Sequence, residues 1–210
     1  MRGARQQTRA ATSRLLVVDA SLMRAAGGEG ATDPVHAHAR EALKAILAIC
    51  HRVCVSAALR EEWRRHRSNF AQLWWRQMYA RRKVVDGEPP SCVEILQDVQ
   101  AFASITQSDR DAVEKDIHLI AAALAADQTV LSWDNRVAAI IRKVCADKQT
   151  LTSKAVSRML WINPIADRET LHAWLSETGP AQPHWPLGAA VVPTAKPPRS
   201  SSRPMPRGKS

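Results

Sequence analysis

The sequence predicts an α/β protein, a three-layer α/β/α sandwich with a central parallel sheet. Two short apolar, β-branched segments, residues 15–19 and 129–134, each end on an aspartate. Such segments are typical of strands that are buried on both faces, as in parallel sheets. Helical patterns lie between the strand patterns, and this alternation favours a parallel sheet with helices on both faces.

The helix and strand patterns can be placed in order along the chain. Asp33 is the expected N-cap of a helix that has Pro34 in its first turn. The glycine-rich segment 27–30 lacks the spacing and the lysine of a phosphate-binding loop, so we interpret it as a connection. The predicted strands are 15–19, 53–56, 129–134 and 159–162, and the predicted helices are 33–50, 57–83 (open to one break), 92–105, 108–126, 135–145 and 168–177.

Length and composition indicate one intracellular domain. The 210 residues, 45% of them hydrophobic, suffice for a single core. We expect no membrane span and no secretory signal, because no run of about twenty uncharged apolar residues occurs. The expected location is therefore cytoplasmic. The four cysteines contain no C-x-x-C pair and are expected to be reduced; Cys50, His51 and Cys54 lack the spacing and the fourth ligand of a zinc site.

The net charge of +10 is concentrated at the two ends and in one internal stretch. Residues 1–14 form a basic N-terminal arm, and residues 179–210 are rich in proline, serine and basic residues. We predict that this basic tail is disordered, because it has too little apolar surface to offset the entropy of ordering.

The internal basic stretch, residues 57–83, also carries half of the aromatic side chains. Basic groups offset phosphate charge and aromatic faces stack on unpaired bases, so Arg64, Arg65 and Arg67 are candidate substrate-binding residues for RNA. The alternative is an amphipathic helix whose aromatic side chains face the core and whose charges face water.

Four acidic residues are candidates for a shared site. Asp19 and Asp134 follow strands, and ligands of open α/β folds bind at the carboxyl ends of strands. Asp116 lies at the edge of the apolar stripe of its helix, and Glu62 lies one turn into the helix after Ser56. Neighbouring carboxylates repel one another unless a cation neutralises them, and Mg²⁺ or Mn²⁺ prefers oxygen ligands.

Each acid also has a purely structural alternative. Asp19 or Asp134 would cap the helix that follows it, Asp116 would pair with a nearby cation, and Glu62 would balance Arg65. Glu61 competes with Glu62, since adjacent helical residues point about 100° apart. The spacing from Ser56 favours Glu62. The histidines, including His118 beside Asp116, have no evident partner, so we expect them to be incidental.

These acids and their surroundings resemble the PIN-domain nucleases, which include the VapC-type toxins of bacterial toxin–antitoxin pairs. In that family an aspartate ends the first strand, a glutamate follows the second, an aspartate lies in a helix rich in small residues, and another closes the next strand behind Thr or Ser. The resemblance covers residues 15–162 and predicts a nuclease domain over 15–178. The matching positions are Val17-Val18-Asp19-Ala20-Ser21, Glu62 after Ser56, Asp116-Ile117-His118-Leu119-Ile120-Ala121-Ala122-Ala123 and Leu131-Ser132-Trp133-Asp134.

The resemblance implies a Mg²⁺- or Mn²⁺-dependent endoribonuclease. Asp19, Glu62, Asp116 and Asp134 would be catalytic, and the three aspartates would hold the metal. Ser132 is a candidate substrate contact, although its hydroxyl is expected to hydrogen-bond a carboxylate rather than to attack the phosphate. A small antitoxin and a second copy of the chain are the expected protein partners. Ser21 stands where many members have Asn.

Two other functions remain as alternatives. A non-catalytic RNA-binding module would keep the fold and the basic helix, but it has no need of the complete acid set. A phosphatase of the haloacid dehalogenase type also starts with a strand that ends in aspartate. It requires a second aspartate two residues later, where this chain has Ser21.

Overall fold

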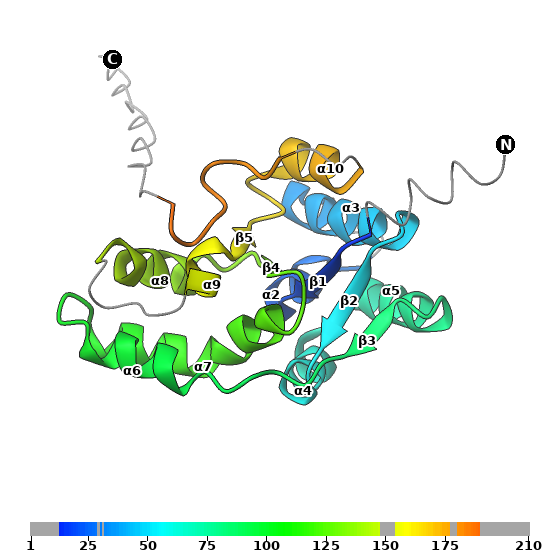
Figure 1. The fold of residues 1–210 in the computed structure, drawn as a ribbon. Helices are drawn as coiled ribbons and strands as arrows, with labels where there is room; N and C mark the ends of the chain where they lie inside the picture. Colours follow the sequence, from blue (N-terminus) through cyan, green and yellow to red (C-terminus); the bar gives the residue numbers. More distant parts are fainter. Residues whose placement is uncertain (1–12, 29, 31, 148–153, 177–179, 190–210) are drawn as a thin grey trace, which may run out of the picture.

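The computed structural model describes residues 13–28, 30, 32–147, 154–176 and 180–189. Its parallel sheet has the strand order β3-β2-β1-β4-β5, with β1 in the centre (Figure 1). Helices cover both faces, so the predicted three-layer α/β/α sandwich is confirmed. The strands are β1 (Leu15–Val18), β2 (Arg52–Val55), β3 (Val84–Asp86), β4 (Thr129–Leu131) and β5 (Leu160–Ile162).

The chain builds the sheet outward from its centre in two directions. It passes from β1 to β2 and β3 on one side, then returns to place β4 and β5 on the other side. Strand order therefore reverses between β1 and β4, and such a reversal opens a crevice at the carboxyl ends of the two strands. Asp19 follows β1 at that point.

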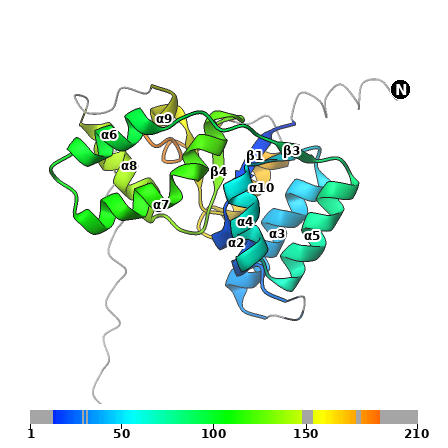
Figure 2. The same cartoon turned by 90° about the horizontal axis from the view of Figure 1, so that it is seen from below.

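Two sets of helices cover the sheet, one on each face (Figures 1 and 2). One face carries α3, α5 and α10, with α2 and α4 at the carboxyl end of β1; the other face carries the remaining helices. The helices are α2 (Ala20–Ala25), α3 (Pro34–Ala48), α4 (Ala57–His66), α5 (Asn69–Ala80), α6 (Val93–Ala101), α7 (Gln107–Leu124), α8 (Arg136–Ala146), α9 (Lys154–Arg158) and α10 (Arg168–Ser176).

Local caps set the helix boundaries. Asp33 caps α3 as predicted, because its Oδ1 accepts a hydrogen bond from the backbone N–H of Val35 at 2.8 Å. The predicted helix 57–83 is broken at Ser68, whose hydroxyl caps α5. Helix α7 begins earlier than predicted, since Thr106 caps it in a reciprocal pair with Asp109.

Strand β3 is absent from the sequence prediction. Its three residues are partly exposed, so they lack the continuous apolar pattern that identifies a buried strand. The strand forms because the backbone of Val84 to Asp86 pairs with β2 at the edge of the sheet. Tertiary pairing, rather than local pattern, decides its structure.

The C-terminal segment 180–189 packs on the domain. Trp185 and Leu187 are fully buried, and the backbone N–H of Trp161 in β5 donates to the Trp185 carbonyl at 2.9 Å. The Trp185 ring also meets the ring of Trp174 edge-on, with centroids 5.5 Å apart. The prediction that disorder begins at residue 179 is therefore wrong for 180–189. Residues 1–12 of the predicted arm and 190–210 of the predicted tail lie outside the described residues.

The buried His51 ring connects the segment before β1 to the end of α10 by hydrogen bonds. The His51 ring accepts a hydrogen bond at Nδ1 from the backbone N–H of Arg14, 3.1 Å away, and donates from Nε2 to the Leu175 carbonyl at 2.8 Å. Burial lowers the His51 pKa, so the ring is neutral. Among the described residues, no helix is both long and apolar enough to cross a membrane.

Candidate active site

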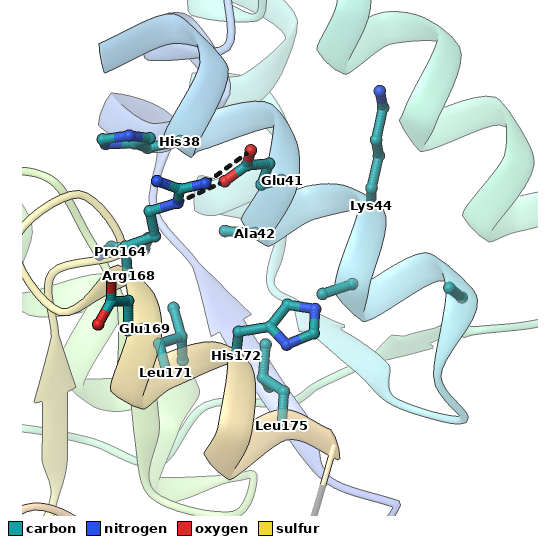
Figure 3. A pocket seen from close by; sticks show the side chains of 12 residues that line it. His38, Glu41, Ala42, Lys44, Pro164, Arg168, Glu169, Leu171, His172 and Leu175 are labelled. Atoms are coloured by element: carbon teal, nitrogen blue, oxygen red, sulfur yellow. Dashed lines mark hydrogen bonds and ion pairs between the residues drawn. The ribbon is translucent and has the colours of Figure 1, made fainter. Parts of the chain in front are cut away.

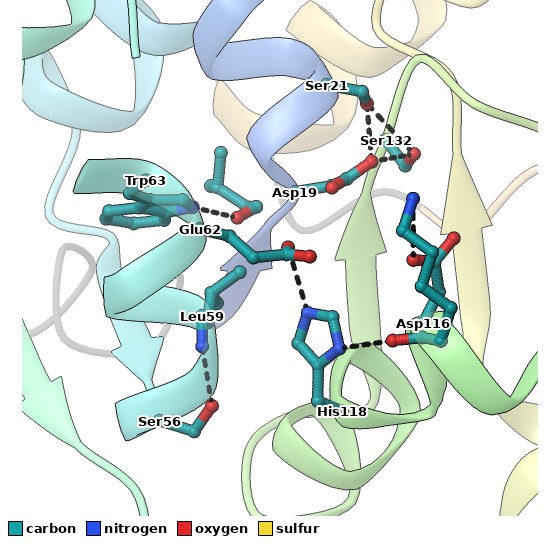
Figure 4. Close-up of polar contacts among 11 residues, drawn as sticks. Asp19, Ser21, Ser56, Leu59, Glu62, Trp63, Asp116, His118 and Ser132 are labelled. Carbon is teal, nitrogen blue, oxygen red and sulfur yellow. Dashed lines mark hydrogen bonds and ion pairs between the residues drawn. The ribbon is translucent and has the colours of Figure 1, made fainter. Parts of the chain in front are cut away.

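Asp19 is held at the carboxyl end of β1 by two serine hydroxyls (Figure 4). The register of β1 with β4 pairs Val18 with Leu131, which brings the next residues, Asp19 and Ser132, side by side. The Ser132 hydroxyl donates to Asp19 Oδ2 at 2.5 Å, and the Ser21 hydroxyl donates to the same oxygen. The side chain does not cap α2. No donor to Oδ1 is seen in the described part of the chain, so this oxygen is available to a ligand.

The two serines that hold Asp19 are themselves fixed by hydrogen bonds from the backbone. Ser132 is fully buried, and its Oγ accepts from the Asp134 backbone N–H at 3.0 Å. The Ser21 Oγ accepts from the Trp133 backbone N–H at 3.1 Å. The expected hydrogen bond from Ser132 to a carboxylate is thus present. A fully buried side chain offers no surface to a substrate, so Ser132 orients Asp19 instead.

Glu62 faces the same region from α4 and pairs with His118 of α7. The His118 Nε2–H donates to Glu62 Oε2 at 3.0 Å, and Nδ1 lies 3.1 Å from the Lys115 carbonyl. Both ring nitrogens face acceptors, which fits a doubly protonated, positively charged ring. Burial lowers the His118 pKa, but the hydrogen bond and charge of Glu62, the Lys115 carbonyl and the charge of Asp116 together raise it overall.

The same contact keeps Glu62 ionised. Its pKa is lowered, chiefly by the hydrogen bond from His118, although burial acts in the opposite direction. The expectation that His118 is incidental is therefore wrong. Its partner Glu62 lies 56 residues away in the sequence, and neither residue type nor helical spacing pairs the two.

Glu61 points away from this region and binds two arginines. Arg64 contacts it through two nitrogens at 2.8 Å, and Arg65 contacts it at 2.9 Å. These hydrogen bonds hold the Glu61 pKa at about 2. Glu62 is thus the glutamate that faces the site. The contacts also mean that two of the three candidate substrate-binding arginines share one carboxylate on an exposed surface.

Other parts of the basic stretch have structural roles. Arg60 pairs with Asp86, and Lys83 donates to the Leu47 carbonyl at 2.7 Å and to the Ile49 carbonyl at the end of α3. Trp63 and Trp74 are buried in the core. The amphipathic alternative therefore describes both sides of this stretch: Trp63, Trp74 and also Phe70 lie in the core, and the arginines of α4 lie on the surface.

Asp116 completes a group of three carboxyls, Asp19, Glu62 and Asp116, which we call the carboxylate cluster. Burial raises the Asp116 pKa most, and the charges of Asp19 and Glu62 raise it further. Lys115 opposes this, but its Nζ lies 3.9 Å from Asp116 Oδ1 and its side chain is 76% exposed. The charge of the buried His118 ring also lowers the Asp116 pKa, but its Nε2 bonds Glu62, and the Asp116 pKa remains raised overall.

The Asp134 side chain bonds the start of α8 rather than the carboxylate cluster. Its side chain is exposed, and its Oδ1 accepts from the backbone N–H of Arg136 at 2.8 Å at the start of α8. The bond satisfies the first N–H of α8, as a cap would, although Asn135 occupies the N-cap position of this helix. No interaction of its carboxyl with the carboxylate cluster is seen in the described residues, so its role as a metal ligand stays a prediction.

The cluster is not a closed metal cage. Within the described ranges, no three His, Cys, Asp or Glu side chains lie close enough together to form a ready metal site. Mg²⁺ typically keeps several waters and binds through one or two carboxylates plus substrate phosphate. Asp19, whose Oδ1 receives no hydrogen bond from the described residues, and Asp116, whose pKa is raised, fit that mode of binding.

A separate hollow of about 710 Å³ lies between α3 and α10 (Figure 3). The ion pair of Glu41 with Arg168, at 2.8 Å, lies along it, and His172 projects from α10. None of the residues that line it belongs to the carboxylate cluster.

Searches against known protein families and against characterised proteins find no match to this chain. The functional argument therefore rests on the carboxylate cluster and its position at the strand-order reversal.

Proposed function

We propose that the protein is a Mg²⁺- or Mn²⁺-dependent endoribonuclease of the PIN-domain type. The observation that carries this proposal is Asp116, a partly buried carboxyl whose pKa is raised by burial and by the charges of Asp19 and Glu62, although Lys115 and His118 act in the opposite direction. Maintaining like charges together in a protein costs free energy unless a cation offsets it. The position of the cluster at the switch point of the sheet also favours ligand binding there.

The residues present fit a hard divalent cation. Asp19, through its open Oδ1, and Asp116 would hold the ion, and Asp134 is the further ligand that the family resemblance implies. A cation bound there would lower the pKa of a water molecule and stabilise charge on the phosphoryl oxygens. Ser21 and Ser132 fix the direction of the Asp19 carboxylate.

Glu62 has a role distinct from that of the aspartates. His118 keeps it ionised and fixes its orientation. A carboxylate in this state accepts a hydrogen bond from the attacking water and aligns it with the phosphorus atom. Glu62 thus positions the nucleophile, and His118 positions Glu62.

The proposed substrate is RNA, bound in part by Arg64, Arg65 and Arg67 at the C-terminal end of α4. The net charge of +10 supports a polyanionic substrate. The finer proposal is a cytoplasmic toxin that is bound by a small antitoxin and that pairs with a second copy of itself. This part rests on the family resemblance.

Asp116→Asn tests the activity. We expect at least about a hundredfold loss of cleavage of a fluorescent single-stranded RNA in Mg²⁺ or Mn²⁺, because the variant loses a charge that faces the proposed ion. Asp111→Asn is the matched control: Asp111 is exposed on the same helix and bonds Gln107. A chelator should abolish wild-type cleavage. Metal-independent cleavage, or full activity of Asp116→Asn, would refute the proposal, whereas RNA binding without any cleavage would favour the non-catalytic alternative.

A further inference from the structure

Trp133 is an exposed tryptophan beside the carboxylate cluster. Its side chain is 41% exposed, whereas Trp63, Trp74, Trp161, Trp174 and Trp185 are buried. An exposed indole gives up the stabilisation that burial of a large aromatic side chain supplies. Tyr79 is more exposed, at 65%, so exposure alone does not distinguish Trp133; its position between Ser132 and Asp134, at the carboxyl end of β4, does.

The backbone of Trp133 is fixed on both sides. Its N–H donates to the Ser21 Oγ at 3.1 Å, and its carbonyl accepts from the Asn163 side-chain amide at 3.3 Å. The preceding residue, Ser132, bonds Asp19, and the following residue, Asp134, accepts a hydrogen bond from the first N–H of α8. The indole thus projects from a rigid bend whose hydrogen bonds also orient Asp19.

The three residues that follow Trp133 in the sequence are polar. Asp134, Asn135 and Arg136 are all exposed. Protein-binding surfaces usually present a contiguous apolar patch. The other large apolar side chains that are exposed among the described residues, Leu73, Tyr79 and Val93, lie on α5 and α6. A lone aromatic face on a polar rim is instead suited to stacking on one nucleobase.

We infer that Trp133 stacks on an unpaired nucleobase next to the scissile phosphate and so positions the RNA over the carboxylate cluster. The inference rests on the proposed nuclease function and adds a residue that contacts a base of the substrate. A base in a duplex is already stacked on its neighbours, so stacking on Trp133 selects single-stranded RNA or a loop.

The test compares Trp133→Leu and Trp133→Phe with the wild type. Leu keeps an apolar side chain without a π face, whereas Phe keeps the face. Binding of single-stranded RNA is measured in the Asp116→Asn background, so that the RNA stays intact. We expect Trp133→Leu to weaken binding about five- to a hundredfold and Trp133→Phe to recover most of it. Val93→Ala, an exposed apolar position on α6, is the control and should bind normally.

A second measurement separates stacking from a general fall in affinity. RNA oligonucleotides with one abasic nucleotide are tested at each position around the cleaved bond. One abasic position should weaken binding to the protein that carries Trp133, yet have little effect in Trp133→Leu, because the partner ring is already missing. Thermal midpoints of both variants check that they fold.

The outcomes distinguish this inference from the proposed function. The stacking role would be overturned if Trp133→Leu bound RNA as tightly as the protein that carries Trp133. It would also be overturned if an abasic nucleotide weakened binding equally in the two proteins, even if cleavage remains metal-dependent. Loss of self-association in Trp133→Leu, with RNA binding unchanged, would assign the indole to a protein contact and also overturn it. Conversely, wild-type RNA binding with Trp133-dependent abasic effects, but with no cleavage, would leave the stacking role and refute the nuclease.

Discussion

The indole N–H of Trp63 donates to the carbonyl of Val18 at 2.9 Å. Trp63 immediately follows Glu62 on α4, and Val18 immediately precedes Asp19 at the end of β1. One buried hydrogen bond therefore fixes the helix that carries Glu62 against the strand that carries Asp19. The distance between these two acids depends on a core contact rather than on the acids themselves.

Trp63→Phe should remove this hydrogen bond and leave a cavity. We expect a decrease of about 1 to 3 kcal/mol in the free energy of unfolding, measured by urea denaturation, together with a fall in kcat. Trp75→Phe is the control, because Trp75 packs edge-on against Trp63 with ring centroids 4.9 Å apart but is only partly buried. Equal decreases in the two variants would contradict a special role for the Val18 hydrogen bond.

Asp116→Asn should raise thermal stability at neutral pH when no divalent cation is present. The Asp116 pKa is raised in the folded state, so the stability that it contributes is present below its unfolded pKa and is lost as the pH rises through the folded value. Asn cannot ionise, so the variant avoids this loss of stability at neutral pH. The measurement is the melting temperature with chelator and with Mg²⁺: Mg²⁺ should stabilise the wild type and have little effect on the variant. A metal shift of equal size in both proteins would count against Asp116 as a ligand.

His118→Gln should change the pH dependence of cleavage. The hydrogen bond from His118 is the main cause of the lowered Glu62 pKa, and burial acts against it. Without the charged ring, the Glu62 pKa rises, so the acidic limb of the kcat/KM profile should move to higher pH. His66→Gln on α4 acts on Glu62 only through a weaker charge effect and should move it less. Superimposable profiles of His118→Gln and wild type would show that Glu62 does not titrate in catalysis.

Replacement of Arg64, Arg65 and Arg67 by Gln should weaken RNA binding at least about threefold near 0.1 M salt. The plot of log affinity against log salt should become shallower by about 0.7 for each RNA phosphate that the variant no longer neutralises. Because Arg64 and Arg65 already share Glu61, we expect the change in slope to correspond to fewer than three phosphates. A triple replacement of the exposed cations Lys143, Lys154 and Arg158 matches the charge change. Parallel salt slopes would identify the α4 arginines as a solvated surface.

Trp185→Ala should destabilise the domain by about 3 to 5 kcal/mol, the usual effect of deleting a buried aromatic side chain. The Trp185 ring is fully buried against Trp174, although the surrounding sequence is rich in proline. Pro183→Ala, at an exposed position of the same segment, is the control. Unchanged denaturation of Trp185→Ala would show that this segment contributes nothing to the fold.

The sequence by itself determined those features that depend on neighbouring residues. The buried strands β1 and β4 follow from continuous apolar runs, and the start of α3 follows from Asp33 before Pro34. Hydrophobic periodicity and helix capping act within a few residues, so they can be recognised from one sequence. The position of Asp19 at the end of β1 and the choice of Glu62 over Glu61 were predicted in the same way.

Tertiary structure alone decided which side chains meet. His118 binds Glu62 across 56 residues, and Ser132 binds Asp19 across 113 residues. The fold also added β3 to the sheet edge and packed Trp185 against Trp174. Each of these outcomes depends on strand register and helix docking, which the free energy of the whole core sets. A local pattern records which groups a segment offers, but not which distant groups reach them.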